Sequence, residues 1–194
     1  MKTIKGQPLV ESGCLDSNRN VFYSKFGEIL FTMRQPRKSD DRNQRIAWKK
    51  VGEASRRRYI RLYVDQDIYD MKKRCRMPLY RGEVPGILPL TVEMDGETVG
   101  FCDIFFKYGK DFAKFEVPPE DKCATGSITA LDKYMGMGVG TGYSSTSNAI
   151  AKHFGCQWIL GTTFMKGGMR SIRAKDGWKV VRRRGELVDH KKKL

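Results

Sequence analysis

Four glycines, Gly136, Gly138, Gly140 and Gly142, alternate with other residues in the stretch Tyr-Met-Gly-Met-Gly-Val-Gly-Thr-Gly-Tyr-Ser-Ser. The stretch follows a strand-like run and precedes a helix-like one. Glycine lets the backbone approach a ligand closely because no Cβ intervenes, and the following helix directs its unpaired N–H groups and positive dipole end to the same spot. The pattern predicts a cradle for a phosphate.

The chain has 194 residues, which fits one ordinary domain that needs neither a disulfide nor a cofactor to fold. Its five cysteines are far apart with no C-x-x-C pair, and only two histidines are present, so neither a disulfide framework nor a metal site is indicated. No run reaches the roughly 20 apolar residues of a membrane span, and no signal-peptide core follows the first residues. We expect a soluble, intracellular protein, located in the cytoplasm.

The formal net charge of +15 is unevenly distributed along the chain. Residues 34–61 carry eleven Lys or Arg against three acids, and residues 166–194 carry the same numbers. Residues 86–165, which include the glycines, carry six bases and nine acids. Basic flanks attract polyanions, so nucleic acid or an acidic macromolecule is a candidate partner. Solubility with non-specific attraction explains the charge equally well.

The first half of the chain contains several recognisable elements. Residues 1–27 lack a clear period and are predicted to form an N-terminal extension. A short strand is predicted over 28–34, a basic amphipathic helix over 42–62 and a second helix over 65–76. Two apolar runs joined by Asp-Gly over 88–106 predict a β-hairpin.

The second half continues with alternating strands and helices. The predicted elements are a strand over 123–131, the glycine loop, a helix over 141–154, a strand over 157–164, a short helix over 168–176 and a strand from 178. We therefore expect one domain over 28–181, followed by a basic C-terminal tail over 182–194.

This order of elements resembles the GCN5-related N-acetyltransferase (GNAT) family, over nearly the whole chain from residue 28. The segment Met-Gly-Met-Gly-Val-Gly at 135–140 occupies the place of the family's Arg/Gln-x-x-Gly-x-Gly/Ala loop. Residues 154–160 look like the family's helix end and fifth strand, and residues 176–181 look like its following turn and strand. The resemblance implies an α/β (α+β) fold with a mixed, mostly antiparallel central sheet flanked by helices.

The resemblance also implies acetyl-CoA or another acyl-CoA as the ligand of the loop. The residues expected to hold its pyrophosphate are Met137, Gly138, Val139, Gly140 and Thr141. Ile128 and Ala130 are expected to run beside the pantetheine arm, in a gap between their strand and the strand over 158–163. The loop departs from the family at its first position, which is Met135, and Lys133 is a candidate substitute for the missing phosphate contact.

Catalytic residues are less evident. The tyrosine that the family often uses as general acid corresponds to Arg173, which cannot donate a proton near neutral pH but can stabilise negative charge. The family commonly uses a carboxylate as base, and the nearest candidates are Asp103, Glu116 and Asp132. For Asp103, on a hairpin strand, a solvated outward position is favoured over catalysis.

Two tyrosines flank the glycines. Tyr134 precedes the loop and is a candidate catalytic residue, and Tyr143 follows it. Ordinary packing explains both. Cys123 and Cys156 are expected to be small core residues, since nothing nearby in sequence would lower the pKa of either thiol.

The basic flanks bear on the acceptor. In the family, the helices that here contain Arg56, Arg57, Arg58 and Arg61 wall the acceptor side of the cleft, and Arg182, Arg183 and Arg184 add a second basic group. The favoured hypothesis is an acyl-CoA-dependent N-acyltransferase whose acceptor amine belongs to a nucleic acid or an associated protein. The alternative is a non-catalytic basic module on the same fold that binds nucleic acid or an acidic partner. The oligomeric state is not indicated.

Overall fold

The computed structural model describes residues 2–53, 55–56, 70–164, 173 and 176–194. In this part of the chain nine strands form one sheet in the order β1-β2-β3-β4-β5-β6-β7-β9-β8. All neighbouring strands are antiparallel except β6 and β7, which are parallel. The strands are β1 (Leu9–Asp16), β2 (Val21–Phe26), β3 (Ile29–Arg34), β4 (Gly86–Met94), β5 (Glu97–Tyr108), β6 (Lys122–Ala130), β7 (Trp158–Phe164), β8 (Lys179–Arg184) and β9 (Leu187–Lys193). The expected mixed, mostly antiparallel sheet is confirmed.

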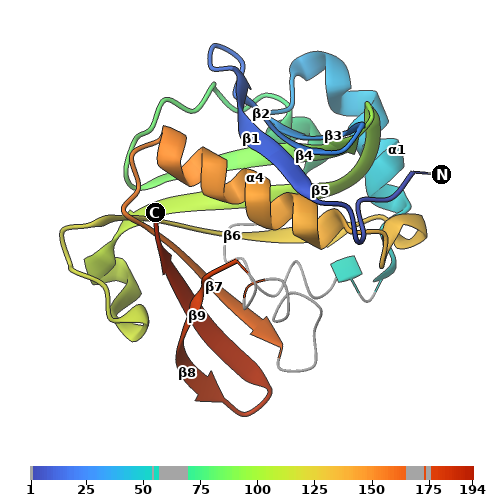
Figure 1. Ribbon diagram of the computed structural model, residues 1–194. Helices are drawn as coiled ribbons and strands as arrows, with labels where there is room; N and C mark the ends of the chain where they lie inside the picture. The colour runs from blue at the N-terminus through green and yellow to red at the C-terminus, as the bar shows by residue number, and fades with distance from the viewer. Residues whose placement is uncertain (1, 54, 57–69, 165–172, 174–175) are drawn as a thin grey trace.

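The described helices cover both faces of the sheet. Helix α4 (Val139–His153) crosses one face, as Figure 1 shows, and α1 (Asp41–Lys49) lies on the other with the short α3 (Met71–Arg74). Three 3-10 turns accompany them: η1 (Lys38–Asp40), η3 (Gly109–Phe115) and η4 (Asp132–Tyr134). None of the helices described is long and apolar enough to cross a membrane.

The β4–β5 hairpin forms as the Asp-Gly pair predicts. Met94 pairs with Glu97, and the two turn residues Asp95 and Gly96 have φ angles of 49° and 80°. Both angles are positive, which this tight turn requires and which glycine adopts without strain.

The predicted helix over 42–62 is shorter than expected. Helix α1 ends at Lys49, and residues 50–52 separate it from the helical residues 53, 55 and 56. The amide of Gly52 donates to Asp132 Oδ1 (2.8 Å), and a Cβ at Gly52 would collide with that carboxylate. A tertiary contact therefore interrupts a continuous sequence pattern. Residues 57–62 lie outside the described part of the chain, as does most of the predicted helix over 168–176.

Helix α4 packs closely on the sheet. A Cβ at Gly142 would lie 2.5 Å from the Phe31 ring, so glycine at this position allows the close approach. Ser24 on β2 shares a buried hydrogen bond with Thr146 (2.9 Å). Phe154, directly after α4, makes edge-to-face ring contacts with Phe22 and Phe106 in the hydrophobic core.

Both ends of the chain belong to the sheet. We expected residues 1–27 to form an extension, but β1 and β2 lie within them, with Phe22, Ser24 and Phe26 buried on one face. We expected residues 182–194 to form a tail, but β9 is inserted between β7 and β8. Val188, Asp189 and His190 of β9 are buried, whereas a solvated tail would leave these side chains exposed.

Candidate functional site

The parallel pair β6 and β7 stays together for only three residue pairs. Cys123 pairs with Trp158, Ala124 with Ile159 and Thr125 with Leu160. Beyond these pairs β6 remains on β5 as far as Ala130, while β7 remains on β9 as far as Phe164. The two strands therefore diverge after Thr125 and Leu160, and no strand of the described residues pairs with the edge of β6 beyond Thr125.

The free edge of β6 carries the residues that were expected to line a pantetheine arm. The amide of Leu131 donates to the carbonyl of Val99 on the β5 side (2.9 Å). Amides in a strand alternate between its two edges, so those of Ile128 and Ala130 point toward the diverged side. Along this edge they offer hydrogen bonds to an extended ligand.

The glycine loop lies at the end of β6, where α4 begins. Gly136 and Gly138 have φ angles of 76° and 91°, so the loop turns sharply twice before the helix starts at Val139. Val139 places its side chain in the core, and its amide and that of Gly140 belong to the first turn, where a helix has no acceptor for them. Thr141 completes this turn through a bond from its amide to the carbonyl of Gly138 (2.9 Å).

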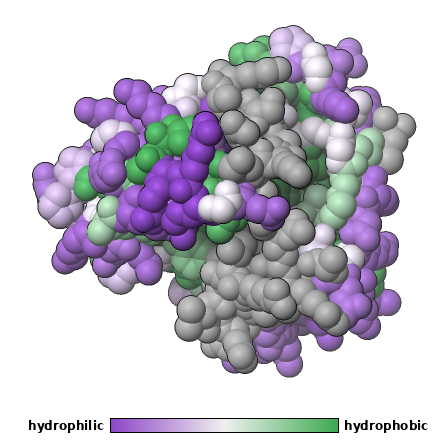
Figure 2. All heavy atoms as spheres, turned by 90° about the horizontal axis from the view of Figure 1, so that it is seen from below, coloured by the Kyte–Doolittle hydropathy of each residue, from purple (hydrophilic) through white to green (hydrophobic). Residues whose placement is uncertain are grey.

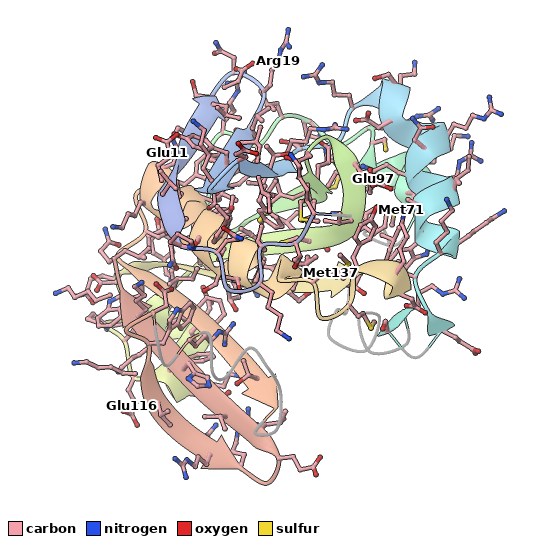
Figure 3. All side chains as sticks on the ribbon, turned by 45° about the vertical axis from the view of Figure 1, so that its right-hand side comes forward. Glu11, Arg19, Met71, Glu97, Glu116 and Met137 are labelled. Atoms are coloured by element: carbon pink, nitrogen blue, oxygen red, sulfur yellow. The ribbon has the colours of Figure 1, made fainter. Side chains whose placement is uncertain are left out.

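The N-terminal segment packs against this loop. Ile4 is fully buried, and its amide and the Thr3 hydroxyl both donate to the carbonyl of Met137 (3.3 and 2.6 Å). A Cβ at Gly138 would lie 2.7 Å from the amide nitrogen of Lys5. Figure 3 shows Met137 beside this segment. The contact brings the exposed Lys5 to the edge of the loop, which the sequence pattern did not reveal.

Two glycines occupy the point where β6 and β7 diverge. Gly126 and Gly161 directly follow the last parallel pair, and a side chain comes close to each from the α4 face. A Cβ at Gly126 would lie 3.1 Å from the Tyr143 hydroxyl, and one at Gly161 would lie 2.5 Å from Arg173 Nη1. The divergence is therefore lined by a phenol and a guanidinium.

The phenol stays protonated at neutral pH. Burial raises the pKa of Tyr143 well above its ordinary range, and the positive charge of Arg173 opposes that rise. A buried, protonated tyrosine beside a cation is suited to donating a proton or a hydrogen bond to an anion. The sequence leaves Tyr143 open between packing, capping and a role beside the loop; its position one turn after the glycines is the local signal, and the structure adds that its hydroxyl lies near Gly126.

Arg173 is held in place from several sides. Its guanidinium lies 4.4 Å from the centre of the Trp178 ring, and its carbonyl accepts from the amides of Asp176 and Trp178 (3.2 and 3.1 Å). Asp176 in turn accepts from Asn148 on α4 (2.9 Å). Only 4 % of Arg173 is exposed, and burial lowers the pKa of its guanidinium.

Asp103 is a buried ion-pair partner. It faces the α1 side of β5 and is fully buried with Arg74, whose Nη1 donates to Asp103 Oδ1. Arg74 Nη2 also donates to the carbonyls of Leu90 and Cys102. The expectation of a solvated, outward Asp103 is wrong, because this carboxylate compensates a buried cation.

A second candidate base, Glu116, lies elsewhere, and the third, Asp132, accepts a hydrogen bond from the Gly52 amide. Glu116 ends η3 in a left-handed conformation (φ 53°), is exposed, and its carbonyl accepts from Lys191 Nζ (2.6 Å). In Figure 3 it lies beside the β8–β9 hairpin, far from Met137. The fold does not bring Glu116 to the glycine loop.

Tyr134 lies in η4, just before the loop. It is 1 % exposed, with the Lys133 ammonium 4.5 Å from its ring centre. Burial and the Glu97 carboxylate raise the pKa of this phenol. Lys133 Nζ forms an exposed ion pair with Glu97 Oε1 (2.7 Å).

The cysteines are structural. Burial raises the pKa values of the Cys123 and Cys156 thiols to about 12, so both remain protonated at neutral pH. Their expected role as small core residues agrees with their burial.

The basic residues are spread over separate surfaces. Arg56 is half-buried in the short helical segment after Gly52, and Arg57, Arg58 and Arg61 lie outside the described residues. Arg182 and Arg184 on β8 reach the buried carboxylate of Asp189 (3.7 and 3.0 Å), and Arg183 is exposed. Figure 2 shows hydrophilic residues over both flanks of the face seen from below, outside the grey atoms.

A cleft with a volume of about 420 Å³ gathers further cations. Its lining includes Arg19, Arg37, Lys38 and Arg76, together with the apolar Met77 and other residues. Figure 3 shows Arg19 at the opposite end of the sheet from Met137. The cleft is thus separate from the glycine loop.

Structural comparison identifies the architecture. The GNAT domain of PAT from S. lividans has a TM-score of 0.58 and 15% identity, covering 85% of this chain and 91% of that chain. A GNAT-family acetyltransferase from Listeria monocytogenes has a TM-score of 0.57 and 12% identity, covering 87% and 97%. RimJ from Mycobacterium smegmatis, in complex with CoA-disulfide, has a TM-score of 0.54 and 13% identity, covering 100% and 90%. This chain has the GNAT fold.

The GNAT fold is present with low sequence similarity. No protein-family model and no curated protein sequence matches the chain. Identities of 12% to 15% make it a divergent example of the GNAT fold. Within that fold, β6, the glycine loop and α4 follow one another in the order expected from the sequence.

Proposed function

We propose that this protein is an acyl-CoA-dependent N-acyltransferase. The observation that carries the proposal is the divergence of β6 from β7, which opens a free strand edge leading from the glycine loop to Tyr143 and Arg173. In the GNAT-fold protein RimJ from M. smegmatis the bound molecule is CoA-disulfide, which supports a ligand of this type.

The described residues fit an acyl-CoA in three ways. The α4 N-terminus, with the first-turn amides at Val139 and Gly140, suits the pyrophosphate. The amides of Ile128 and Ala130 suit the pantetheine arm, as hydrogen-bond donors along an edge that lacks a partner strand. Gly126 to Ala130 spans about 13 Å of strand, a length that suits an arm reaching from the loop to Tyr143.

The chemistry is acyl transfer to an amine. The nitrogen of a neutral amine attacks the thioester carbonyl carbon, the C–N bond forms and the C–S bond breaks. The proton released from the nitrogen passes, directly or through water, to the Tyr143 oxygen and restores the phenol that has protonated the sulfur. Tyr143 would donate a proton to the departing sulfur, and Arg173 would stabilise the negative charge that develops beside it. Neither Asp103, paired with Arg74, nor the distant Glu116 is needed for these steps, provided that the amine arrives unprotonated.

The acceptor that we propose is an amine on a nucleic acid or an associated protein. The charge of +15 and the cationic cleft lined by Arg19, Arg37, Lys38 and Arg76 support it, because exposed cations attract phosphates over distance. Such a reaction would take place in the cytoplasm, where acyl-CoA is available.

The test is binding followed by turnover. Acetyl-CoA at millimolar concentration should raise the thermal midpoint of the wild-type protein by mass action. Gly140→Glu puts a carboxylate at the α4 N-terminus and should abolish the rise, while Ser145→Glu, later on the same helix, should retain it. Release of free CoA should then depend on an amine acceptor, screened among DNA, tRNA, basic peptides and small amines. Absence of any shift in the wild type would reject the proposal.

The alternative is a non-catalytic basic module that binds nucleic acid or an acidic partner. It is favoured by the ion pair of Asp103 with Arg74 and by the distance of Glu116 from the loop, because two of the three predicted bases are then not available at the site. Its signature would be nucleic-acid affinity that falls steeply with salt and does not change when acetyl-CoA is added.

A further inference from the structure

Arg173 carries more hydrogen-bonding capacity than its surroundings use. Nε and Nη1 are both buried, and neither has a hydrogen-bond partner in the structure. Arg173 as a whole is 4 % exposed, so bulk water has little access to these two nitrogens. A buried cation is costly unless an anion accompanies it, and its usual partner is a carboxylate.

Among the residues that the structure describes, the acids nearest to this region are engaged with other groups. Asp103 lies on the opposite face of the sheet and pairs with Arg74. Asp176 receives the Lys192 ammonium on Oδ1 (3.0 Å) and hydrogen bonds from Asn148 and Trp178 on Oδ2. The Trp178 ring occupies one side of the guanidinium but supplies no oxygen. The site therefore offers a positive charge to a ligand.

The position of Arg173 indicates which ligand. It lies against Gly161, directly beyond the last β6–β7 pair and on the same side as Tyr143. An acyl chain attached to a thiol at the divergence would extend toward this point. We propose that the acyl chain ends in a carboxylate that Arg173 binds, so that the donor is the CoA thioester of a dicarboxylic acid.

Arg173 would therefore be a specificity-determining residue. A planar carboxylate accepts charge-assisted hydrogen bonds from guanidinium N–H groups and restores neutrality in the buried site. An acetyl group would leave the same N–H groups without acceptors. Discrimination of this kind is large, because the poorer ligand leaves buried polar groups unpaired.

This inference rests on the proposed function, and the experiment separates the two. Binding of CoA, acetyl-CoA and succinyl-CoA to the wild-type protein would be measured by titration calorimetry. The wild type should bind succinyl-CoA at least about tenfold more tightly than acetyl-CoA. If none of the three binds, the proposed function fails. If all three bind with equal affinity, only the inference about the carboxylate is overturned.

Two variants test the residue itself. Arg173→Met has similar length without charge and should remove the preference for succinyl-CoA over acetyl-CoA. Arg173→Lys should retain part of the preference. A preference that survives in Arg173→Met would overturn the assignment to this residue. An equal loss of turnover with both donors, with no binding preference in the wild type, would leave Arg173 only its role beside the departing sulfur and would overturn the assignment of a carboxylate to it.

A further arm distinguishes the source of the carboxylate. Glycine and glycinamide would be compared as acceptors with acetyl-CoA as donor. A preference for glycine that depends on Arg173, without a donor preference, would assign the carboxylate to the acceptor and overturn the proposal. The wild-type donor comparison needs no variant, so the proposal stays testable even if Arg173→Met does not fold.

Discussion

The amide of Ile4 donates a hydrogen bond to the carbonyl of Met137 across 133 positions of sequence, and the Ile4 side chain is fully buried beneath the glycine loop. The N-terminal residues thereby support the loop from which α4 starts. The loop is not formed by its own glycines alone.

Ile4→Ala should lower the free energy of unfolding by about 2–5 kcal/mol, because a buried isoleucine is truncated to a cavity. It should also weaken acetyl-CoA binding by loosening the support of Gly138. Urea unfolding and calorimetry measure the two effects. Leu9→Ala, at a position 48 % exposed in the same part of the chain, is the control and should change stability by less than about 0.5 kcal/mol. Equal effects of the two substitutions would contradict the role of Ile4.

Gly142→Ala should destabilise the protein by about 1–3 kcal/mol, since the added Cβ would lie 2.5 Å from the Phe31 ring. Of the four alternating glycines, this one serves helix packing. The cost should fall in a Phe31→Leu background, where the ring is absent, and a thermodynamic cycle measures the difference. If the stability costs of Gly142→Ala and Phe31→Leu were additive, the contact between the added Cβ and the Phe31 ring would not explain the cost. Ser145→Ala on the same helix is the matched control.

Asp103→Ala should lower the free energy of unfolding by about 3–5 kcal/mol, because it removes the carboxylate that compensates the buried Arg74. The double variant Arg74→Met/Asp103→Leu should lose less than the two single variants together. In protein that remains folded, the pH dependence of kcat/KM should match that of the wild type. If the kcat/KM profile of Asp103→Asn lost the fall at low pH that the wild type shows, Asp103 would instead be identified as the general base.

Asp189 should make the β8–β9 hairpin sensitive to acid. Burial opposes its ionisation, but hydrogen bonds from Arg184 (3.0 Å) and Thr162 (2.6 Å) prevail and hold the pKa of this carboxyl below its ordinary value. The stabilisation is therefore present above the unfolded pKa of about 3.9 and is lost as pH falls through the folded value. The stability difference between wild type and Asp189→Asn should shrink as the solution is acidified below pH 4.

Unfolding by urea at several pH values between 7 and 2 measures this difference. Glu186→Gln, at the exposed turn of the same hairpin, is the control and should show no comparable trend. A constant difference between wild type and Asp189→Asn at all pH values would contradict the assignment.

The sequence predicted most elements of the fold because their signals are local. The Asp-Gly pair specifies the β4–β5 turn, and the glycines mark the start of α4. The predictions failed where a distant contact decides. Helix α1 ends at Lys49, and Gly52 beyond it contacts the distant Asp132; β9 joins the sheet, where Val188, Asp189 and His190 are buried beside neighbouring strands.

In the candidate site, too, some residues could be predicted from the sequence and others only from the fold. Its loop residues, from Met137 to Thr141, follow from spacing and glycine content, and so does their likeness to a phosphate cradle. Tyr143 and Arg173 could not be paired from the sequence, because 29 residues of sequence separate them and only the packing of both against Gly126 and Gly161 brings them together.

By itself, then, the sequence determined the order of strands and helices, the glycine loop and the strongly basic charge, because each depends on neighbouring residues or on composition. Tertiary structure alone decided that Asp103 is neutralised by Arg74, that Ile4 supports the loop, and that a buried guanidinium lies where β6 and β7 diverge. Burial and pairing of charges are properties of three-dimensional packing, so they emerge only when distant segments meet.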